Sequence, residues 1–511
     1  MADRAAAHRA TELVRGLRGA EVVVAGFGTA GRSAARFLQD QGAEVTILDA
    51  AFGDPETVDG AVRTGVDEAL ADPGLWQRAR LLVVSPGFPP DHPLVAAAQA
   101  AAVPVWGEVE LAWWVDQSGV TGAPRTWLVI TGTNGKTTTT AMVESIVAAA
   151  GTAVAACGNF GTPVLDILTR APRVEVLCVE ASSFQLHWAP SPTPAAGVVL
   201  NVAEDHLDWH GGMDGYRDAK ARALRGAVAV VGGDDAIAAH LPVGEGARRV
   251  AFTLGEPADG ELGVVGGVLV DRAFGDGVEL IGADRIQPAG PSGRADALAA
   301  AALALAIGVP AAAVTAGLDG FTPAGHRGER VARVSRAAAG SVDFIDDSKA
   351  TNPHAAAAAI AGRSRVVLIA GGLLKGASVD ELIEGARESL GGVVAIGRDR
   401  GEIVDAIARH APEVPTVTVF TGDDGRVMAT THVFDNGAAA PIGPAAGDDR
   451  GAAAAVMTEA VRRAWGLAEA DADVDAVLLA PAAASLDMFD SYAARGDAFA
   501  AAAGELPGAQ R

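Results

Sequence analysis

Residues 130–140 read ITGTNGKTTTT and contain the residue types of a phosphate-binding loop. An apolar strand leads into Gly132-Thr133-Asn134-Gly135-Lys136-Thr137, and a helix-compatible stretch begins at Thr138. Glycines let backbone N–H groups turn toward a polyphosphate, and the beginning of a helix adds partial positive charge. Lys136 would reach the outer phosphates, and the Thr137 hydroxyl would bind Mg²⁺. The segment therefore predicts a nucleoside triphosphate site.

The loop is a shorter variant of the common pattern G-x-x-x-x-G-K-[ST], because Ile130 stands where that pattern has its first glycine. A glycine-rich turn with a solvated lysine is the alternative interpretation. The succession of strand, turn and helix favours phosphate binding.

A second glycine turn lies near the N-terminus. The apolar run 21–25 leads into Gly26-Phe27-Gly28-Thr29-Ala30-Gly31, and Asp49 follows about twenty residues later at the end of another strand. This is the dinucleotide fingerprint, in which the acid contacts a ribose, and NAD, FAD and UDP-sugars can all use such a turn. Ser85-Pro86-Gly87 follows the run 81–84, either as a ligand loop or as a plain turn.

Two polar clusters follow apolar runs in the middle of the chain. Glu180 follows the run 176–179, and His206 lies shortly after the run 197–200. A carboxylate at a strand end beside a phosphate loop can hold Mg²⁺, and the histidine could be a second metal ligand. A structural histidine among solvated acids is the alternative. Lys220 lies in a helical stretch, where its local sequence indicates a surface lysine.

Two lysines follow strands in the C-terminal third. Lys349 lies within DDSKATNP at 346–353, and Lys375 lies within GGLLKG at 371–376. A lysine on a loop at the carboxyl end of a strand suits a carboxylate or a phosphoryl group in transit. Ordinary loop lysines would explain either one singly.

Composition limits the classes of function. The chain has 511 residues, of which 50% are hydrophobic, and its net charge is −23. The length suggests about three domains, and the charge argues against a sequence-independent nucleic-acid binder. Cys157 and Cys178 fit neither a zinc site nor a disulfide framework, which favours a reducing compartment. Because no apolar run approaches ~18 residues, we expect a cytoplasmic protein with no membrane partner.

The alternation of strands and helices predicts an α/β protein. In the last third, the apolar runs 342–345, 365–370, 392–396, 416–420 and 476–480 alternate with helical stretches, which indicates a parallel sheet. Turn formers near 116–125 and 321–328 predict domains at 1–118, 119–325 and 326–511. A hairpin region is expected within 252–290, and an inserted, flexible and peripheral loop at 421–451.

Taken together, these motifs resemble those of the Mur ligase family of peptidoglycan synthesis, and in particular its D-glutamate-adding branch, over nearly the whole chain. GTNGKTT at 132–138 is shared with several Mur ligases and with folylpolyglutamate synthases. EASSFQL (180–186), NVAEDHLD (201–208), DDSKATNP (346–353) and PAAASLDMF (481–489) are similar to the D-glutamate branch. The resemblance implies an N-terminal Rossmann-like UDP-binding domain, a central P-loop-type ATPase domain and a C-terminal Rossmann-like domain that brings the amino acid.

The resemblance also implies a reaction. ATP phosphorylates the carboxylate of UDP-N-acetylmuramoyl-L-alanine, and the amine of D-glutamate then attacks the acyl phosphate. A carboxylate is a poor electrophile until one of its oxygens becomes a phosphate leaving group. Catalysis is therefore expected to consist mainly of positioning and of charge stabilisation by Mg²⁺ and lysines. Two Mg²⁺ ions and a monomeric protein are expected.

Site residues follow from the resemblance position by position. The catalytic group matches Lys136, Asn159, His206, Lys220 and Lys349, and the metal ligands match Thr137, Glu180, His206 and Lys220, the last carried as a carbamate. ATP contacts match Gly132, Thr133, Asn134, Gly135, Lys136, Thr137, Thr138, Asp296, Arg327 and Asp347. UDP contacts match Gly28, Thr29, Gly31, Asp49, Ser85, Pro86 and Gly87. D-Glutamate contacts match Lys349, Thr351, Lys375, Ser485, Leu486 and Tyr492.

Four positions depart from the family pattern. Ala30 stands where a hydroxyl residue often contacts the diphosphate, which removes a hydrogen bond worth about 1 kcal/mol. Gly293 and Asp296 stand near the expected adenine site, where relatives commonly have asparagine, and Asp346 also replaces a common asparagine. Asp296 cannot donate a hydrogen bond, and an added anion near phosphates costs on the order of 1–4 kcal/mol.

Three alternatives stay open. A folylpolyglutamate synthase-like ligase would share the central loop, but it would not explain the N-terminal glycine turn or the cluster at 346–353. An NAD(P)-dependent oxidoreductase would use 26–49 as its cofactor site. A non-catalytic nucleotide-binding regulator would have no need for Lys136, Glu180, His206, Lys220 and Lys349 together.

Overall fold

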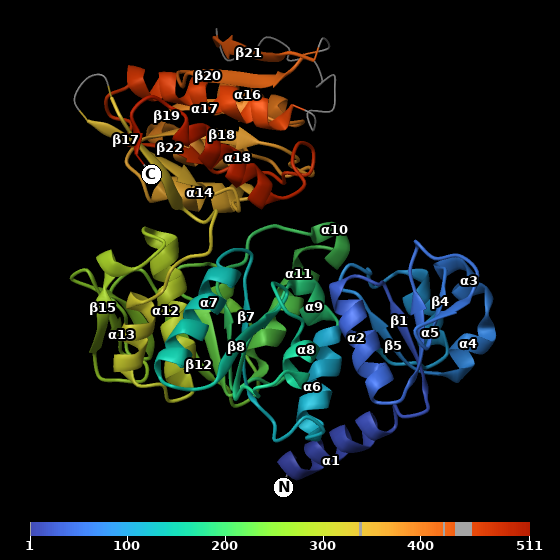
Figure 1. Cartoon of the computed structure of the whole chain (residues 1–511). Coiled ribbons are helices and arrows are strands. Elements are labelled where there is room, and N and C mark those ends of the chain that lie inside the picture. The colour runs from blue at the N-terminus through green and yellow to red at the C-terminus, as the bar shows by residue number, and fades with distance from the viewer. Residues whose placement is uncertain (1, 337–339, 423–424, 435–451, 511) are drawn as a thin grey trace. The chain divides into compact units, whose positions relative to one another are not determined.

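The computed structural model describes residues 2–336, 340–422, 425–434 and 452–510 (Figure 1). Over these residues the chain forms three mostly parallel sheets flanked by helices, which confirms the predicted α/β class. Two compact units divide the chain. The first comprises 1–285 and 295–321 and contains two of the sheets, and the second comprises 286–294 and 322–511 and contains the third. The three predicted domain boundaries therefore stay predictions.

The first sheet has the strand order β3-β4-β2-β1-β5-β6. Its elements are α1 (Ala2–Arg15), β1 (Glu21–Ala25), α2 (Thr29–Asp40), β2 (Glu44–Leu48), β3 (Glu56–Val58), β4 (Ala61–Thr64), α3 (Val66–Ala71), α4 (Pro73–Arg78), β5 (Ala79–Val84), α5 (Pro93–Ala100), β6 (Val105–Trp106) and α6 (Glu108–Ser118). The central strands β2, β1 and β5 are parallel and apolar on both faces, as expected of a sheet covered by helices on both sides. Their carboxyl ends therefore lie at one edge.

The second sheet has the order β15-β14-β13-β12-β11-β10-β7-β9-β8. It is built from β7 (Thr126–Thr131), α7 (Lys136–Ala149), β8 (Val154–Gly158), α8 (Val164–Thr169), β9 (Val176–Glu180), α9 (Ser183–His187), β10 (Ala196–Val199), α10 (Leu207–His210), α11 (Met213–Ala221), η1 (Arg222–Arg225), β11 (Val228–Gly232), η2 (Ala238–His240), β12 (Arg248–Phe252), β13 (Glu261–Val265), β14 (Val268–Asp271), β15 (Val278–Gly282), η3 (Ala283–Arg285), α12 (Pro291–Ala306) and α13 (Ala311–Asp319). The antiparallel strands β13, β14 and β15 confirm the predicted hairpin region.

The third sheet has the order β21-β20-β19-β18-β22-β17-β16-β23. Its elements are β16 (Glu329–Ser335), β17 (Ser341–Asp346), α14 (Pro353–Ala361), β18 (Val366–Gly371), α15 (Asp380–Ala386), η4 (Arg387–Ser389), β19 (Leu390–Ile396), α16 (Arg400–His410), β20 (Thr416–Thr421), β21 (Val427–His432), α17 (Ala453–Ala470), β22 (Ala476–Leu479), α18 (Tyr492–Gly504) and β23 (Ala509–Gln510). All five strands predicted for this part of the chain are confirmed.

The prediction of a wholly irregular loop at 421–451 is wrong for its first part. Residues 427–432 form β21, which pairs antiparallel with β20 from Thr416 opposite His432 to Thr421 opposite Val427. Met428 and Thr430 lie on an edge strand and are opposed by Phe420 and Thr418, so cross-strand pairing orders a stretch without a strong apolar run. Residues 423–424 and 435–451 lie outside the described part of the chain.

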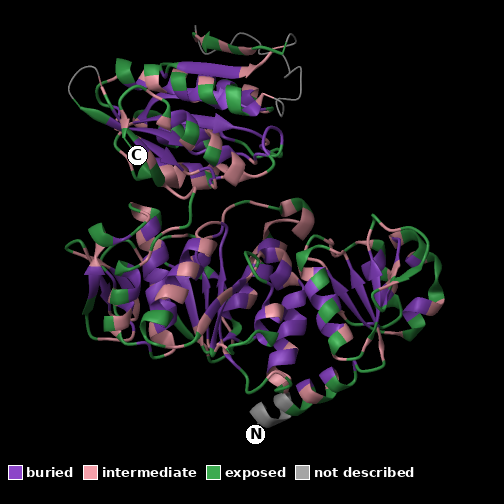
Figure 2. Ribbon diagram, viewed as in Figure 1, coloured by how far each residue is buried: buried purple, intermediate pink, exposed green. Residues whose placement is uncertain are grey.

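The central strands of all three sheets are buried, whereas most helices bury one face and expose the other (Figure 2). One hydrophobic core in the first unit includes Val24 of the first sheet, Val129 of the second and Leu111 of α6. The carboxylate of Asp116 on α6 accepts hydrogen bonds from the Arg125 guanidinium at 2.6 Å and from Trp127 Nε1 at 2.9 Å, all buried. No described helix is long and apolar enough to cross a membrane.

Candidate active site

The phosphate loop joins β7 to α7. Gly135 has a φ of +83° and lies directly before α7, whose beginning carries no side-chain cap. Backbone N–H groups at such a helix end are suited to an anion. Lys136 Nζ donates hydrogen bonds of 2.9 Å to the carbonyl oxygens of Gly132 and Thr133, so this side chain lies back along the loop. Thr137 is partly exposed on the first helical turn, whereas Thr138 is buried.

Two residues that sequence reasoning did not single out brace this loop. Asn201 follows β10 and accepts hydrogen bonds from Thr133 N (3.0 Å, to its carbonyl) and from Asn134 N (2.9 Å, to Oδ1). Tyr216 on α11 places its hydroxyl 3.0 Å from Thr133 Oγ1. The loop conformation is therefore fixed by groups from two other elements.

We expect Gly135→Ala to weaken ATP binding at least tenfold. The positive φ costs a residue with a Cβ about 1–2 kcal/mol, and the added Cβ would overlap Asp296 Oδ1. Calorimetric titration with ATP measures the change. Gly151→Ala is a matched control, because Gly151 has a φ of +78° and its Cβ would meet nothing within 4 Å. A Gly135→Ala variant that binds ATP as tightly as Gly151→Ala would contradict the prediction.

Glu180 ends β9 next to the loop, since its Cα is paired with that of Ile130 on β7. Its Oε1 accepts a 2.9 Å hydrogen bond from Asn159 Nδ2. Its Oε2 is buried and has no hydrogen-bond partner among the described residues. An unsatisfied buried carboxylate oxygen is costly, and a hard cation with a preference for oxygen ligands would satisfy it. The structure thus brings the predicted pair Asn159 and Glu180 together, and the donor chemistry fits Mg²⁺.

Lys220 on α11 is only 1% exposed. The interpretation of this residue as a surface lysine, made from its local sequence, is therefore wrong, because α11 packs this face inward. Its Nζ lies 4.6 Å from the centroid of the Tyr216 ring, one helical turn earlier. Burial first, and then the charge of Lys136, lowers the pKa of Lys220 well below its usual value. A lowered pKa favours the neutral amine, which is the form that reacts with carbon dioxide to give a carbamate.

His206 lies on the loop after β10 in the left-handed conformation, with a φ of +54°. Its ring packs against Phe184 with a centroid distance of 4.6 Å, and its Nε2 is 3.4 Å from Asp205 Oδ2. Among the described residues, histidines, cysteines and acids form no group of three or more that could hold a metal ion. The second metal ion therefore stays a prediction, and it would require a ligand of another kind, such as a carbamate on Lys220.

The first sheet carries the second glycine turn at the carboxyl ends of its strands. A Cβ on Gly31 would overlap the carbonyl oxygen of Gly26, so only glycine permits this close approach. Gly28 precedes α2 without a side-chain cap, and Ser85 Oγ donates to Gly26 O at 3.2 Å. Asp49 follows β2 at the same edge. The turn thus offers the first backbone N–H groups of a 12-residue helix to an anionic ligand.

The loop after β5 is hydrogen-bonded to the end of α9 and to α10, two helices that follow strands of the second sheet. Trp209 Nε1 donates to Gly87 O at 3.2 Å, and Trp188 Nε1 donates to Phe88 O at 3.1 Å. Trp209 lies three residues beyond His206. These bonds bring the loop that contains Ser85, Pro86 and Gly87 next to the segment that contains His206. One extended substrate could therefore contact both.

In the second unit, three loops meet at the carboxyl ends of β17, β18 and β22. Ala482 N donates to Ala350 O, and Leu373 forms a bridge with Ala484. The predicted residues on these loops are Asp347, Lys349, Thr351, Lys375, Ser485, Leu486 and Tyr492. Lys349 Nζ lies 4.2 Å from the centroid of the Tyr492 ring, Lys375 is exposed in the left-handed conformation and Ser485 is buried. The loops predicted to bind one amino acid thus lie together.

Comparison with known proteins decides the family. Residues 130–259 match the Mur ligase middle domain, and residues 20–107 match the Mur ligase MurD-like N-terminal domain. The chain is 54% identical over 495 residues to the UDP-N-acetylmuramoylalanine–D-glutamate ligase of Rhodococcus jostii (strain RHA1), covering 96% of each chain. It is 53% identical to the ligase of that name from Mycobacterium avium (strain 104), covering 95% of this chain and 96% of the relative. The chain belongs to the Mur ligase family, in its D-glutamate ligase branch.

Solved structures agree with the fold of a Mur ligase. MurF from Acinetobacter baumannii has a TM-score of 0.52 and 17% identity, covering 92% of this chain and 89% of that one. At this identity the likeness supports the fold alone. The two domain matches end at residue 107 and begin at residue 130, on either side of α6.

Two departures from the usual Mur ligase pattern have a structural explanation. Asp296 Oδ1 accepts a 3.1 Å hydrogen bond from Thr139 Oγ1 on α7, so its carboxylate lies beside the first turns of this helix. Gly293 packs so closely on the carbonyl oxygen of Pro288 that any Cβ would overlap it. The asparagine that the family resemblance suggests could therefore not occupy position 293 on this backbone. The predicted adenine contact of Asp296 stays a prediction.

Asp347 of this Mur ligase gives a pH-dependent prediction. Burial raises the pKa of its carboxyl to about 7, although the Arg327 guanidinium lowers it. The folded chain therefore keeps a proton that the unfolded chain loses near pH 4, so the stability falls as the pH rises from about 4 to about 7. We expect Asp347→Asn to raise the melting temperature at pH 8 and to leave it unchanged at pH 4, as measured by calorimetry. An equal increase at both pH values would contradict the assignment.

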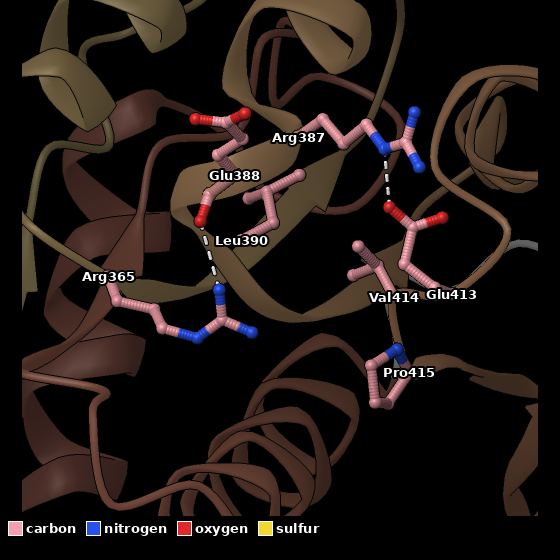
Figure 3. Close-up of a pocket in the computed structure, with 7 residues that line it drawn as sticks. All are labelled: Arg365, Arg387, Glu388, Leu390, Glu413, Val414 and Pro415. Atoms are coloured by element: carbon pink, nitrogen blue, oxygen red, sulfur yellow. Dashed lines mark hydrogen bonds and ion pairs between the residues drawn. The ribbon is translucent and has the colours of Figure 1, made fainter.

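A cavity of the C-terminal unit lies away from this site (Figure 3). It has a volume of about 470 Å³ and is lined by Arg365, Arg387, Glu388, Leu390, Glu413, Val414 and Pro415. It lies at the amino ends of β18, β19 and β20, whereas the predicted D-glutamate loops follow the carboxyl ends of strands in that sheet. Arg387 is paired with Glu413, and Arg365 with Asp471 at 2.7 Å. Its cationic groups are therefore already neutralised.

Sequence reasoning missed several members of the Mur ligase site. Tyr216 could have been found, because it lies four residues before Lys220 and hence on the same helical face. The other missed residues join segments that are distant in sequence. They are Asn201, Trp209, and His210 with Ser183, whose Nε2 and Oγ atoms are 2.9 Å apart. Nothing local could have indicated their partners.

Proposed function

We propose that this chain joins D-glutamate to UDP-N-acetylmuramoyl-L-alanine with hydrolysis of ATP to ADP and phosphate. The substrate carboxylate attacks the γ-phosphate and becomes an acyl phosphate. The amine of D-glutamate then attacks the carbonyl carbon, and phosphate leaves. This order is required chemically, because an amine does not displace oxide from a carboxylate. The proposal adopts the activity that the names of the closely similar relatives state.

One observation supports the proposal above the others. The loop that contains Gly87 is predicted to hold the UDP end of the substrate, and it accepts a hydrogen bond from Trp209. Trp209 lies three residues after His206, in the segment that follows β10. Strand β10 is paired with β7, the strand that leads into the phosphate loop. A nucleotide-sugar substrate bound at the first sheet can therefore extend its carboxylate toward the γ-phosphate. An oxidoreductase or a folylpolyglutamate synthase would have no need for this arrangement.

The proposed roles follow from the chemistry of each group. Lys136 would move from its loop carbonyls to the β- and γ-phosphates and stabilise the charge that develops during transfer. Glu180, oriented by Asn159, would hold Mg²⁺ together with Thr137, and His206 and a carbamate on Lys220 would hold a second ion. Mg²⁺ bound there would neutralise the phosphate oxygens. Lys349, Thr351, Lys375, Ser485, Leu486 and Tyr492 would hold D-glutamate.

The lysine content supports these roles. The chain has 40 lysines and arginines, and only four are lysines: Lys136, Lys220, Lys349 and Lys375. Arginine supplies every other cationic side chain. An arginine cannot be deprotonated or carry a carbamate, and its planar fork does not replace a compact ammonium group. All four lysines lie at predicted site positions, where those properties matter.

The test is phosphate release from ATP with UDP-N-acetylmuramoyl-L-alanine and one amino acid at a time, with mass detection of the product. D-Glutamate, L-glutamate, meso-diaminopimelate and L-lysine are compared. Phosphate release and a new amide with D-glutamate alone are expected. Activity with a different amino acid would reassign the pocket around Lys349 and Ser485, and no activity with any of them would favour the regulator alternative. Replacing the L-alanyl substrate by the glycyl one tests acceptor specificity.

Two further expectations accompany the proposed activity, and the purified protein tests the second of them. We propose that the enzyme acts in the cytoplasm, where the nucleotide-activated substrates are made, and that it is a monomer. Light scattering at micromolar concentration should give a mass near 51.4 kDa. A mass of twice that value would replace the monomer by a dimer.

A further inference from the structure

The acid of the dinucleotide fingerprint in the first sheet, Asp49, is hydrogen-bonded to backbone groups of the protein. Asp49 Oδ2 accepts a 2.7 Å hydrogen bond from Phe27 N, and Oδ1 accepts a 3.0 Å hydrogen bond from Ala51 N. The carboxylate thus ties the glycine turn to the loop after β2. Both of its oxygens have strong backbone donors, so its main effect is to fix the positions of Phe27 and Phe52.

Around these two rings the structure gathers cationic side chains. Phe27 and Phe52 have centroids 5.9 Å apart. The Arg63 guanidinium, from β4, lies 5.0 Å from the Phe27 centroid and 5.9 Å from the Phe52 centroid. Arg32 of α2 lies 5.7 Å from the Phe27 centroid. The cluster stands at the carboxyl ends of β1, β2 and β4, which is the edge where open α/β sheets bind ligands.

Arg63 keeps most of its hydrogen-bonding capacity. Its side chain is 25% exposed, and its ion pair is a 3.4 Å contact with Asp59, whose side chain is 87% exposed. Its Nε has no hydrogen-bond partner among the described residues. A guanidinium close to aromatic rings retains a planar edge of N–H donors and has no acceptor. Such an edge selects a partner rich in carbonyl oxygens.

We propose that Arg63, positioned by Phe27 and Phe52, recognises the uracil base of the nucleotide substrate. Uracil presents two carbonyl oxygens as acceptors, whereas cytosine replaces one of them with an amino donor that faces the guanidinium unfavourably. The half-buried rings of Phe27 and Phe52, which are tilted by 57° to each other, each offer a face on which a pyrimidine can stack beside the guanidinium. This inference rests on the proposed function, and it assigns the specificity for the base to a residue outside both glycine turns.

The experiment titrates the full-length protein with UDP, CDP and inorganic pyrophosphate by calorimetry. The wild type should prefer UDP over CDP. We expect Arg63→Met to weaken UDP binding at least tenfold, to remove the preference over CDP and to leave pyrophosphate binding unchanged. In turnover assays the KM for the UDP-linked substrate should rise at least tenfold, with kcat and the KM values for ATP and D-glutamate within twofold of the wild type.

Methionine keeps the long side chain against the rings, so the variant separates recognition from packing, and its melting temperature reports any loss of fold. Arg63→Lys, which keeps the charge but not the planar donor edge, should also lose the preference for UDP over CDP. Arg78→Met is the matched control, because Arg78 is paired with Glu21 at the amino end of β1. It should bind UDP like the wild type.

Three outcomes would overturn part of the proposal. If the wild type does not bind UDP, the proposed function fails. If the wild type binds UDP and Arg63→Met binds it equally tightly, with the same ratio to CDP, only the role of Arg63 fails. If Arg63→Met loses UDP and pyrophosphate equally, the residue supports the loop rather than reading the base, which also overturns the inference.

Discussion

Lys136→Met is expected to lower kcat by about 10³-fold, because the variant lacks the positive charge that lies at the transferring phosphoryl group. In the structure Nζ of Lys136 is held at 2.9 Å by Gly132 O and Thr133 O, so the ammonium group is already within the loop that would surround the phosphates. Methionine matches the length of the side chain but donates no hydrogen bond. The variant should still fold, since the loop is also braced by Asn201 and Tyr216.

Single-turnover release of phosphate measures this effect. UDP binding is the internal control, because the UDP site belongs to the first sheet and should be unchanged in the variant. Lys136→Arg should recover less than a tenth of the activity, since the guanidinium is too large for the position between Gly132 and Thr133. Product formation by Lys136→Met at a rate near that of the wild type would refute the role of this residue.

Lys220→Met should abolish turnover and yet stabilise the protein. Burial favours the neutral form of the amine and lowers its pKa in the folded chain, whereas the unfolded chain keeps the proton up to a pH of about 10.4. Unfolding at neutral pH is therefore accompanied by proton uptake. The buried amine lowers the free energy of unfolding, and this penalty disappears as the pH approaches about 10.4, the pKa of lysine in the unfolded chain. Methionine fills similar volume without this cost. An increase in the melting temperature of about 2–4 °C is expected, corresponding to about 1 kcal/mol.

The measurement compares the melting temperatures of the two proteins at pH 7 and pH 10 without Mg²⁺ or bicarbonate. The difference should be larger at pH 7, because the penalty for the wild-type lysine fades as the pH rises. Lys220→Arg is the control: it should be inactive and less stable, since a guanidinium can neither lose its proton nor carry a carbamate. A Lys220→Met variant that retains activity would show that no carbamate is needed.

With four lysines in the chain, the carbamate itself can be observed. Carbon-13 spectra of protein equilibrated with labelled bicarbonate should contain one carbamate signal that is absent in Lys220→Met. The persistence of that signal in the variant would assign it to Lys136, Lys349, Lys375 or the N-terminal amine instead.

The sequence by itself determined the positions of the ligand loops. A buried parallel strand followed by glycine and then a helix is a local pattern, and it located the turns at 26–31 and 132–137. Because parallel strands end at one edge of a sheet, it also followed that the loops after neighbouring strands would meet. Strand lengths and the predicted hairpins agree with the structure for the same reason, since periodicity and turn residues act over a few positions.

The same local reasoning failed where distant segments decide the environment of a residue. The sequence around Lys220 is that of a surface helix, and only the packing of α11 buries this amine beside Tyr216 and within the field of Lys136. Residues 427–432 carry no strong strand pattern, and pairing with β20 orders them. Burial and edge pairing depend on what lies opposite, which the local sequence does not contain.

The distinction is clearest at the two nucleotide turns. The sequence placed Asp49 correctly at a strand end. The structure shows that both of its carboxylate oxygens accept hydrogen bonds from backbone N–H groups, and it places the Arg63 guanidinium 5.0 Å from the centroid of the Phe27 ring at the same edge of the sheet. The sequence also located the segments of Gly87 and His206, but not their proximity. That proximity comes from the hydrogen bond between Trp209 and Gly87, which are 122 residues apart in the chain. Local sequence fixes backbone geometry, because glycine and periodicity act at short range; electrostatic environment and partners arise only when the chain folds.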